Sequence, residues 1–594
     1  MKISFSLDDN PSVTDVVKCS SRISSSHPGS DVSSRVLPSF VSYSDHLHFQ
    51  QSLLTLIQLH FLNHLLAPSL QWKRHDSRRP LHKMKQHLPI FFKKVGYVSS
   101  SFFESALLST KVFLQTNTFH ALPEDLPQLC SFASFFGAKL QYVFLHVDGI
   151  FNINETLNYS SIISGLEFKF QNHIDLKFLQ NSSFIFPNLN QFHIRAHSSI
   201  VVEVIALLKV NTSVTSFDLR GNSIGAEGAR ALTETLKVNS NISNIYLGSN
   251  YSGADGARDL ADALKVNVGV TSVYLTNNSF GAEGARSLAE AFKVNTSVKC
   301  INLWNNSIGD EGARAFSEAF RLNTTATCIS LWDNSIGANG ASALTKMLQI
   351  NTTVTHINLE NNSIGAEGTR ALAEMLKINN TLRSINICGN SIGADGARAL
   401  SEMLKINATV TSLELGQNSI GIEGAKALAD ALKVNATVKR IDLIRNSIGD
   451  EGVRLLSEAF KVNATVTSVD LNINSIGDEG VRALAEAFNF NTTVTRVNLE
   501  NNSIGAEGAR SLAEALKLND VVASINLCNN SIGAEGASAL AEMLKVNTTV
   551  TRVVLENNFI GDKGVAALIE ALKVNGTITI EGVYLLYSCS VFKV

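Results

Sequence analysis

The sequence predicts an α/β solenoid built from stacked repeats, and three observations lead to that fold class. An asparagine returns every 28 residues, thirteen times from Asn222 to Asn558, without an insertion or deletion. A glycine follows each of them three residues later, and a second asparagine series from Asn211 to Asn575 runs in step with the first. A strict period of this length is typical of a chain in which each repeat packs only on its neighbours.

The first half of each repeat predicts a short strand. In the first regular repeat, Val214, Phe217 and Leu219 precede Asn222 and Ile224 with the spacing LxxLxLxxNxI. Apolar and polar residues alternate from Phe217 to Leu219, as they do in a half-buried strand. The sharp turn after the strand leaves backbone N–H and C=O groups that need hydrogen-bond partners.

The second half of each repeat predicts a helix. Ala229, Leu232 and Leu236 recur at helical spacing, and charged residues occupy the opposite side. The two glycines of the repeat permit left-handed or close backbone geometry where the chain enters the helix. Asn239 is expected to end the helix, because asparagine tolerates the left-handed cap conformation.

The repeat resembles the leucine-rich repeats of the ribonuclease-inhibitor type, which are also found in NOD-like receptors and Ran GTPase-activating proteins. The resemblance covers residues 199–576 and rests on the LxxLxLxxNxI spacing. It implies a horseshoe with parallel strands on the concave face and helices on the convex face. It also implies that the first asparagine series forms an internal ladder of stacked amides, made of Asn222, Asn250, Asn278, Asn306, Asn334, Asn362, Asn390, Asn418, Asn446, Asn474, Asn502, Asn530 and Asn558.

Composition changes along the chain predict five regions. They are a Ser-rich, disordered N-terminus (1–36), a mostly helical region (37–135), degenerate leading repeats (136–198), thirteen regular repeats (199–576) and a C-terminal cap or tail (577–594). The degenerate repeats have LxxLxL spacing but lack the asparagine and glycine signals, so other folds stay open for that region. In the tail, Glu581 falls where the apolar strand residue of the next unit is expected.

Charge and cysteine usage exclude several functional classes. The net charge is −2, from 50 basic and 52 acidic residues, so no nucleic-acid partner is expected. Seven scattered cysteines without a CxxC pair or zinc spacing predict reduced thiols and no metal. The start of the chain lacks an apolar signal region, so we expect a cytoplasmic protein, with a nuclear location as the alternative because of the basic run at 73–94. The uncharged stretch 53–70 is interrupted by polar residues and predicts a buried or amphipathic helix rather than a membrane span.

Motifs that carry chemistry are not found in the sequence. There is no GxxxxGK[ST] phosphate loop, so no nucleotide-binding module or other cofactor is expected. His356 stands alone among the strand positions of the repeats, and no nucleophile–base pair can be assembled around it. The many Asn-x-Ser/Thr sites, such as Asn295 and Asn351, are attributed to the chemistry of the helix-to-strand turn. The sequence therefore predicts a protein that is not an enzyme.

The positions on either side of the second strand leucine differ from repeat to repeat and face away from the helices, toward the concave face. Four successive repeats place aromatic residues there, namely Tyr246, Tyr274, Trp304 and Trp332. Such residues are favoured binding anchors, although they could also simply stack on one another. Charged residues form a second candidate site, or a face of mutual ion pairs, made of Glu360, Arg440, Asp442, Arg445, Arg496, Glu500 and Arg552.

The sequence therefore predicts a non-enzymatic scaffold that binds a protein partner of unknown identity on its concave face. One alternative is a substrate adaptor of a ubiquitin ligase, because residues 37–94 faintly resemble an F-box. A second alternative is a Ran-type GTPase-activating protein, although this chain lacks the strongly acidic tail of that family.

Overall fold

The computed structural model describes residues 118–121, 142–147, 165–170, 191–195, 198–211, 213–250, 252–582, 584–587 and 590–593. The predictions for 1–36, for the segment 53–70, for the basic run and for the F-box-like region all lie outside these residues. The chain divides into two compact units, residues 1–147 with 152–166 and residues 148–151 with 167–594. No helix among the described residues is long and apolar enough to cross a membrane.

The first unit contains strands β1 (Thr118–Ala121) and β2 (Tyr142–Val147), which pair in parallel with Thr118 opposite Tyr142. Strand β3 (Gly165–Phe170) crosses the boundary between the units. Strands β2, β3 and β4 (Gln191–Arg195) coincide in the sequence with three LxxLxL segments, at 140–145, 163–168 and 189–194, of the region expected to hold degenerate repeats. Whether these are true repeats stays a prediction.

The second unit alternates strands and helices. The strands are β4 (Gln191–Arg195), β5 (Ser216–Asp218), β6 (Asn244–Tyr246), β7 (Ser272–Tyr274), β8 (Cys300–Asn302), β9 (Cys328–Ser330), β10 (His356–Asn358), β11 (Ser384–Asn386), β12 (Ser412–Glu414), β13 (Arg440–Asp442), β14 (Ser468–Asp470), β15 (Arg496–Asn498), β16 (Ser524–Asn526), β17 (Arg552–Val554) and β18 (Thr579–Glu581). The helices are α8 (Ser198–Leu207), α9 (Gly225–Leu236), α10 (Gly253–Leu264), α11 (Gly281–Val294), α12 (Gly309–Phe320), α13 (Ala338–Leu348), α14 (Gly365–Leu376), α15 (Gly393–Leu404), α16 (Gly421–Leu432), α17 (Gly449–Phe460), α18 (Asp478–Phe488), α19 (Ala506–Leu516), α20 (Gly533–Leu544) and α21 (Gly561–Val574).

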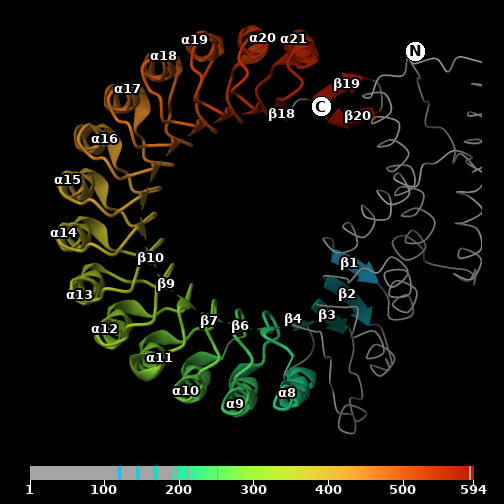
Figure 1. Cartoon of the computed structure of the whole chain (residues 1–594), viewed down its shortest axis with the longest axis vertical. Coiled ribbons are helices and arrows are strands. Elements are labelled where there is room, and N and C mark those ends of the chain that lie inside the picture. Colours follow the sequence, from blue (N-terminus) through green and yellow to red (C-terminus); the bar gives the residue numbers. More distant parts are fainter. Residues whose placement is uncertain are drawn as a thin grey trace, which may run out of the picture. The chain divides into compact units, whose positions relative to one another are not determined.

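Each strand from β4 to β17 pairs in parallel with the next strand in the sequence. Between neighbouring regular repeats the register equals the period, so that Ile245 lies opposite Val273. The strands line the inner side of the arc and the helices form its outer side (Figure 1). The core lies between these two layers and includes the fully buried Phe292, Phe316 and Phe320. The predicted solenoid is confirmed.

The asparagines assigned to the ladder bond the turn after each strand to the neighbouring repeats. Asn390 is fully buried, and its Nδ2 donates to the carbonyl oxygens of Leu359 (2.8 Å) and Ile387 (3.1 Å). Its Oδ1 accepts from the backbone N–H of Ile364 at 3.3 Å, and its own N–H donates to the side chain of Asn418 at 2.8 Å. One amide therefore pairs backbone groups that the turn leaves without partners.

The second asparagine series forms another ladder, which corrects the expected role of Asn239. Lys237, the residue just after helix α9, has the right-handed conformation. Asn239 is not among the described residues with positive φ. Its side chain instead donates to the carbonyl oxygen of Asn211 at 2.8 Å. Asn295 behaves in the same way, since its Nδ2 donates to Leu264 O (2.7 Å) and its Oδ1 accepts from Val298 N (2.8 Å). A buried amide with these bonds closes the helix-to-strand turn without a left-handed residue.

Three glycines depart from the expected left-handed geometry at the start of their helices. Gly337, Gly477 and Gly505 have φ between −94° and −104°, whereas glycines at the same place in other repeats, such as Gly365, have φ near 62°. In each case the preceding repeat has an aspartate where most other repeats have alanine or isoleucine. Asp310 Oδ1, for example, accepts from the backbone N–H groups of Gly337 (2.6 Å) and Gly340 (2.9 Å). The carboxylate therefore caps the next helix and fixes the extended form.

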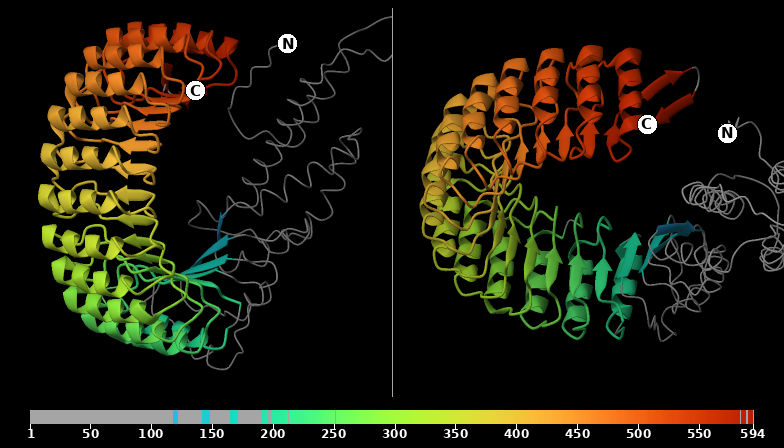
Figure 2. Two further views of the ribbon diagram at one scale, coloured as in Figure 1. Left: turned by 60° about the vertical axis from the view of Figure 1, so that its left-hand side comes forward. Right: turned by 45° about the horizontal axis from the view of Figure 1, so that its top comes forward.

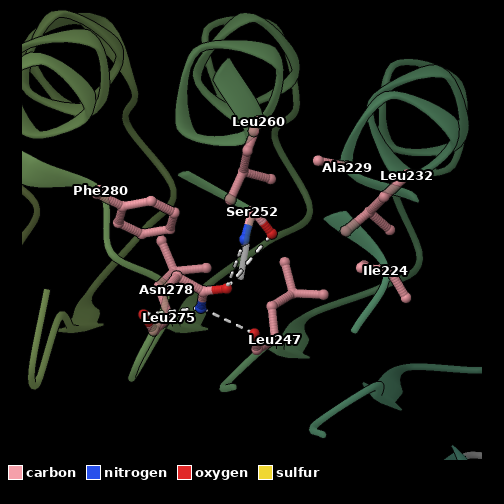
Figure 3. Close-up of a pocket in the computed structure, with 10 residues that line it drawn as sticks. Ile224, Ala229, Leu232, Leu247, Ser252, Leu260, Leu275, Asn278 and Phe280 are labelled. Atoms are coloured by element: carbon pink, nitrogen blue, oxygen red, sulfur yellow. Dashed lines mark hydrogen bonds between the residues drawn. The ribbon is translucent and has the colours of Figure 1, made fainter. Parts of the chain in front are cut away.

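Ser252 replaces the isoleucine that fills the core in most other repeats, and a small cavity lies beside it (Figure 3). The cavity is lined by apolar side chains of adjacent repeats, including Leu232, Leu260 and Phe280. The Ser252 hydroxyl bonds to Asn278 Oδ1 at 3.3 Å, so it is not left unsatisfied. The site belongs to the core of the solenoid.

We expect Ser252→Ile to raise the free energy of unfolding by about 1 kcal/mol, because the added side chain fills the cavity. Urea unfolding followed by circular dichroism measures the change. Ser240→Ile is the control and should not stabilise the protein, because Ser240 is exposed and is not among the described residues with positive φ. Equal effects of both substitutions would contradict the explanation.

The last regular repeat is one residue shorter than the others, which corrects the reading of Glu581. Strand β18 pairs with β17 so that Ile580 lies opposite Val553 and Glu581 opposite Val554. Ile580 therefore occupies the apolar position and is 4% exposed, while Glu581 bonds to Arg552 through both oxygens at 2.9 Å. Beyond it, β19 (Tyr584–Tyr587) and β20 (Ser590–Lys593) form an antiparallel hairpin.

Candidate functional site on the concave face

Each strand of the regular repeats presents two of its three residues to the concave face. The middle residue is buried against the helices, and the residues on either side of it are more exposed, as in Asn244–Tyr246 and Ser272–Tyr274. The residue that follows the next leucine also lies on this face. These positions form rows across the strands, and all sequence-predicted site residues except Arg445 lie in them.

Tyr246 and Tyr274 stack on each other across strands β6 and β7. Their ring centroids are 4.5 Å apart and the rings are 7° from parallel. The Arg220 guanidinium lies 5.5 Å from the centre of the Tyr246 ring, and a bond of 2.6 Å to Asp218 holds it there. Burial, and then the neighbouring Tyr246, raise the pKa of Tyr274. The result is a flat, ordered column of one cation and two aromatic rings.

Trp304 and Trp332 form a second stacked pair, just after strands β8 and β9. Their ring centroids are 4.3 Å apart and the rings are 9° from parallel. The backbone N–H of Trp304 donates to Asn302 Oδ1 at 3.0 Å, which fixes the start of this turn. Both indole Nε1 atoms are shielded from solvent and have no hydrogen-bond acceptor within the described part of the chain. Such donors are costly to leave unsatisfied.

Two cysteines lie close to the aromatic residues and were not selected from the sequence as site residues. Cys300 and Cys328 are opposite each other in the register of β8 and β9. Burial, and then the adjoining Cys300 thiol, raise the pKa of Cys328. Their equal positions in consecutive repeats were visible in the sequence. No group of three or more His, Cys, Asp or Glu side chains in the described residues is placed to hold a metal ion.

The two predicted glutamates are held by asparagines of the next strand. Glu360 Oε2 accepts from Asn386 Nδ2 at 3.0 Å, and Glu500 Oε2 accepts from Asn526 Nδ2 at 2.9 Å. The same arrangement therefore occurs twice, five repeats apart. Both carboxylates are half-buried, so their orientation on the concave face is restrained.

Asp442 lies at the centre of a row of carboxylates. The register of β12, β13 and β14 places it between Glu414 and Asp470. Burial raises the pKa of Asp442 to about 6, with further contributions from the charges of Asp470 and Glu414. The backbone N–H of Ile444 donates to Asp442 Oδ1 at 3.0 Å, and this bond lowers the pKa of Asp442. The sequence placed Asp442 and Asp470 on the same charged surface but did not select Glu414 as a site residue.

The predicted arginines do not converge on one point. Arg440 and Arg496 extend from the first positions of their strands, and Arg440 approaches Asp442 only to 4.0 Å. Arg552 pairs with Glu581, and Arg445 lies in the left-handed turn after β13 with φ 52°. Among the described residues, neither Arg445 nor Arg496 makes an ion pair. The charged positions thus form a dispersed surface, whereas the aromatic positions form two compact pairs.

Comparison with known proteins supports the repeat assignment. The family described as "Leucine Rich repeat" matches nine segments, namely 210–232, 294–317, 351–373, 379–401, 407–429, 434–457, 462–485, 490–513 and 546–568. No curated protein matches the chain. Among solved structures, the chain is similar to "Leiomodin-1 Actin-Binding Site 2 (ABS2)", at 21% identity and a TM-score of 0.24, over 26% of this chain and 89% of that one.

The matched segments all lie in the part of the chain where strands β5 to β17 alternate with helices α9 to α21. The assignment to the ribonuclease-inhibitor type stays a prediction. Sequence period, parallel sheet and family match agree, and the chain is a leucine-rich-repeat protein.

Proposed function

We propose that this protein is a scaffold that binds a protein partner on its concave face, with the two aromatic pairs as the main anchors. Leucine-rich repeats are typically non-enzymatic interaction modules, which supports the general role. The single observation that carries the proposal is the presence of two stacked aromatic pairs, one on β6 and β7 and one just after β8 and β9.

The form of the pairs favours binding over a purely structural role. All four side chains stay partly exposed although each is stacked on a neighbour. Stacked rings lose little conformational entropy on binding, because neighbouring side chains already hold them in place. The two indole N–H groups are shielded from solvent, so the exposed parts of the stacked rings, and not these donors, offer the surface to a partner.

The test compares full-length protein with Trp304→Ala/Trp332→Ala in affinity capture followed by mass spectrometry and titration of the captured partner. Tryptophan hot spots each contribute about 2 kcal/mol or more, so the double variant should bind at least about 100-fold more weakly. Phe559→Ala removes another aromatic side chain, 84% exposed and outside the concave rows, and should bind normally.

Circular dichroism must show that the double variant is folded. Trp304→Phe/Trp332→Phe keeps an aromatic pair at the same positions, so it should bind more tightly than the double alanine variant. A folded double alanine variant that captures the same partners with the same affinity would rule out the aromatic site.

A further inference from the structure

An exposed apolar side chain lies at the end of every helix of the regular repeats or just after it. The residue immediately before each asparagine of the second ladder is Val, Leu, Ile or Phe at all fourteen positions from Val210 to Val574. These side chains are between 55% exposed (Ile350) and 83% exposed (Leu518). We call this series the apolar rim. Apolar residues scattered singly on a surface are ordinary, but an unbroken series of this length is not.

The turn geometry holds each rim side chain outward. At the end of α14, Leu376 is fully buried, Ile378 is 66% exposed and Asn379 is buried again. The Ile378 N–H donates to Met375 O at 3.1 Å, and the Asn379 side chain donates to Leu348 O at 2.7 Å. These bonds fix the backbone of Ile378 and the side chain of Asn379, so the Ile378 side chain is held outward. The position therefore adds little to the buried core.

The rim side chains lie along one edge because the repeats are parallel. The helices lie side by side along the arc and point the same way, so their C-terminal ends lie on one edge of the solenoid (Figure 2). An apolar side chain of this size has about 100 Å² of surface when fully exposed. The fourteen rim side chains, at their observed exposures, therefore present about 900 Å² to solvent. A stable complex buries about 800 Å² on each partner.

We propose that the apolar rim is a dimer interface, on which the same rim of a second copy docks. A two-fold axis that runs along the rim plane through the middle of the arc places the rims of two copies face to face. The two arcs then follow the same curve, so the whole rim is buried in a single interface. A rim with the same residue class at every repeat is complementary to itself. The concave aromatic residues lie on another face and stay accessible in this dimer.

Charges beside the rim favour a protein surface over an anionic membrane. Most rim residues follow a lysine, but these lysines pair with carboxylates one helical turn earlier. Lys377 bonds to Glu374 at 2.6 Å, and Lys405 bonds to Glu402 at 2.6 Å. Binding to anionic lipid requires an excess of positive charge, which this edge does not present. A neutral, apolar partner edge matches it.

The arrangement predicts which residues lie at the two-fold axis. The centre of the fourteen positions falls between Ile378 and Ile406. Ile378→Glu/Ile406→Glu places four carboxylates at the centre of the proposed interface, where desolvation and repulsion oppose association. Ile422→Glu is the matched control, because Ile422 is 44% exposed at the opposite end of helix α16.

The experiment measures the mass of full-length protein by sedimentation and light scattering over a concentration series up to about 100 μM. The wild type and Ile422→Glu should be dimers, and Ile378→Glu/Ile406→Glu should dissociate at least about 100-fold more readily while keeping its circular dichroism spectrum. Mixed isotope-labelled copies should give lysine cross-links between Lys377 of one copy and Lys405 of the other.

A wild type that is monomeric throughout the concentration range would overturn the proposal. A dimer that the double glutamate variant leaves intact, or cross-links confined to the convex helices, would also overturn it. Flotation with phosphatidylcholine vesicles tests whether the rim binds a lipid surface instead. Vesicle binding by a monomer that depends on the rim would show that the rim binds lipid and is not a dimer interface. Partner capture through the concave face is independent of all these outcomes.

Discussion

Asn379→Ala is expected to lower the free energy of unfolding by about 3 kcal/mol, whereas Asn380→Ala should change it by less than about 0.5 kcal/mol. Asn379 is 7% exposed and donates to Leu348 O at 2.7 Å, and its Oδ1 accepts from Leu382 N at 2.8 Å. Alanine leaves both backbone groups buried without a partner. Asn380 is exposed, so the same substitution one residue later removes nothing from the ladder.

Urea unfolding followed by circular dichroism gives the global difference, and hydrogen exchange of the backbone amides locates it. Exchange should accelerate mainly in the repeats on either side of Asn379, because a solenoid is stabilised by contacts between neighbours. If the two variants are equally stable, the second asparagine ladder does not contribute to the stability of the fold.

Asp442→Asn is expected to stabilise the protein by about 2 kcal/mol at pH 7 and to have almost no effect below pH 4. Burial raises the pKa of Asp442 to about 6, so the folded state holds this proton more tightly than the unfolded state does. Stability therefore falls as pH rises from about 4 to 6, and the penalty persists above that window. Asparagine keeps the acceptor for Ile444 N–H and removes the charge.

The measurement is the free energy of unfolding of both proteins in urea at several pH values between 4 and 8. Asp395→Asn is the control, because Asp395 is an exposed carboxylate paired with Arg398 on helix α15. The control should follow the wild type at every pH. A pH-independent difference between Asp442→Asn and the wild type would show that the charge of Asp442 is not the cause.

The sequence was sufficient for the fold because its signal is repeated and local. The apolar spacing of residues such as Phe217 and Leu232 fixes one strand and one helix, and the constant period fixes how they stack. The constant period also predicted that Glu581 takes the apolar strand position. That prediction was wrong, because the last repeat is one residue shorter. A single deletion changes the register without changing the composition, so only the paired strands reveal it.

The candidate site was predicted only as a set of positions. Alternation along the strands placed Trp304 and Trp332 on the concave face, but stacking and the unsatisfied indole groups depend on side-chain geometry that spacing does not specify. The raised pKa of Asp442 likewise depends on register with Glu414 and Asp470. The apolar rim was visible as a repeated residue class, but its exposure becomes evident only once the turn geometry is known.

A protein partner is expected to bind the concave face at the aromatic pairs. Hydrogen exchange of the full-length protein, measured with and without its captured partner, tests this expectation. Partner binding should slow exchange in β6 to β9 and in the turns that carry Trp304 and Trp332, and it should leave the convex helices unchanged. Protection confined to the helices or to the rim, with no change in these strands, would contradict it.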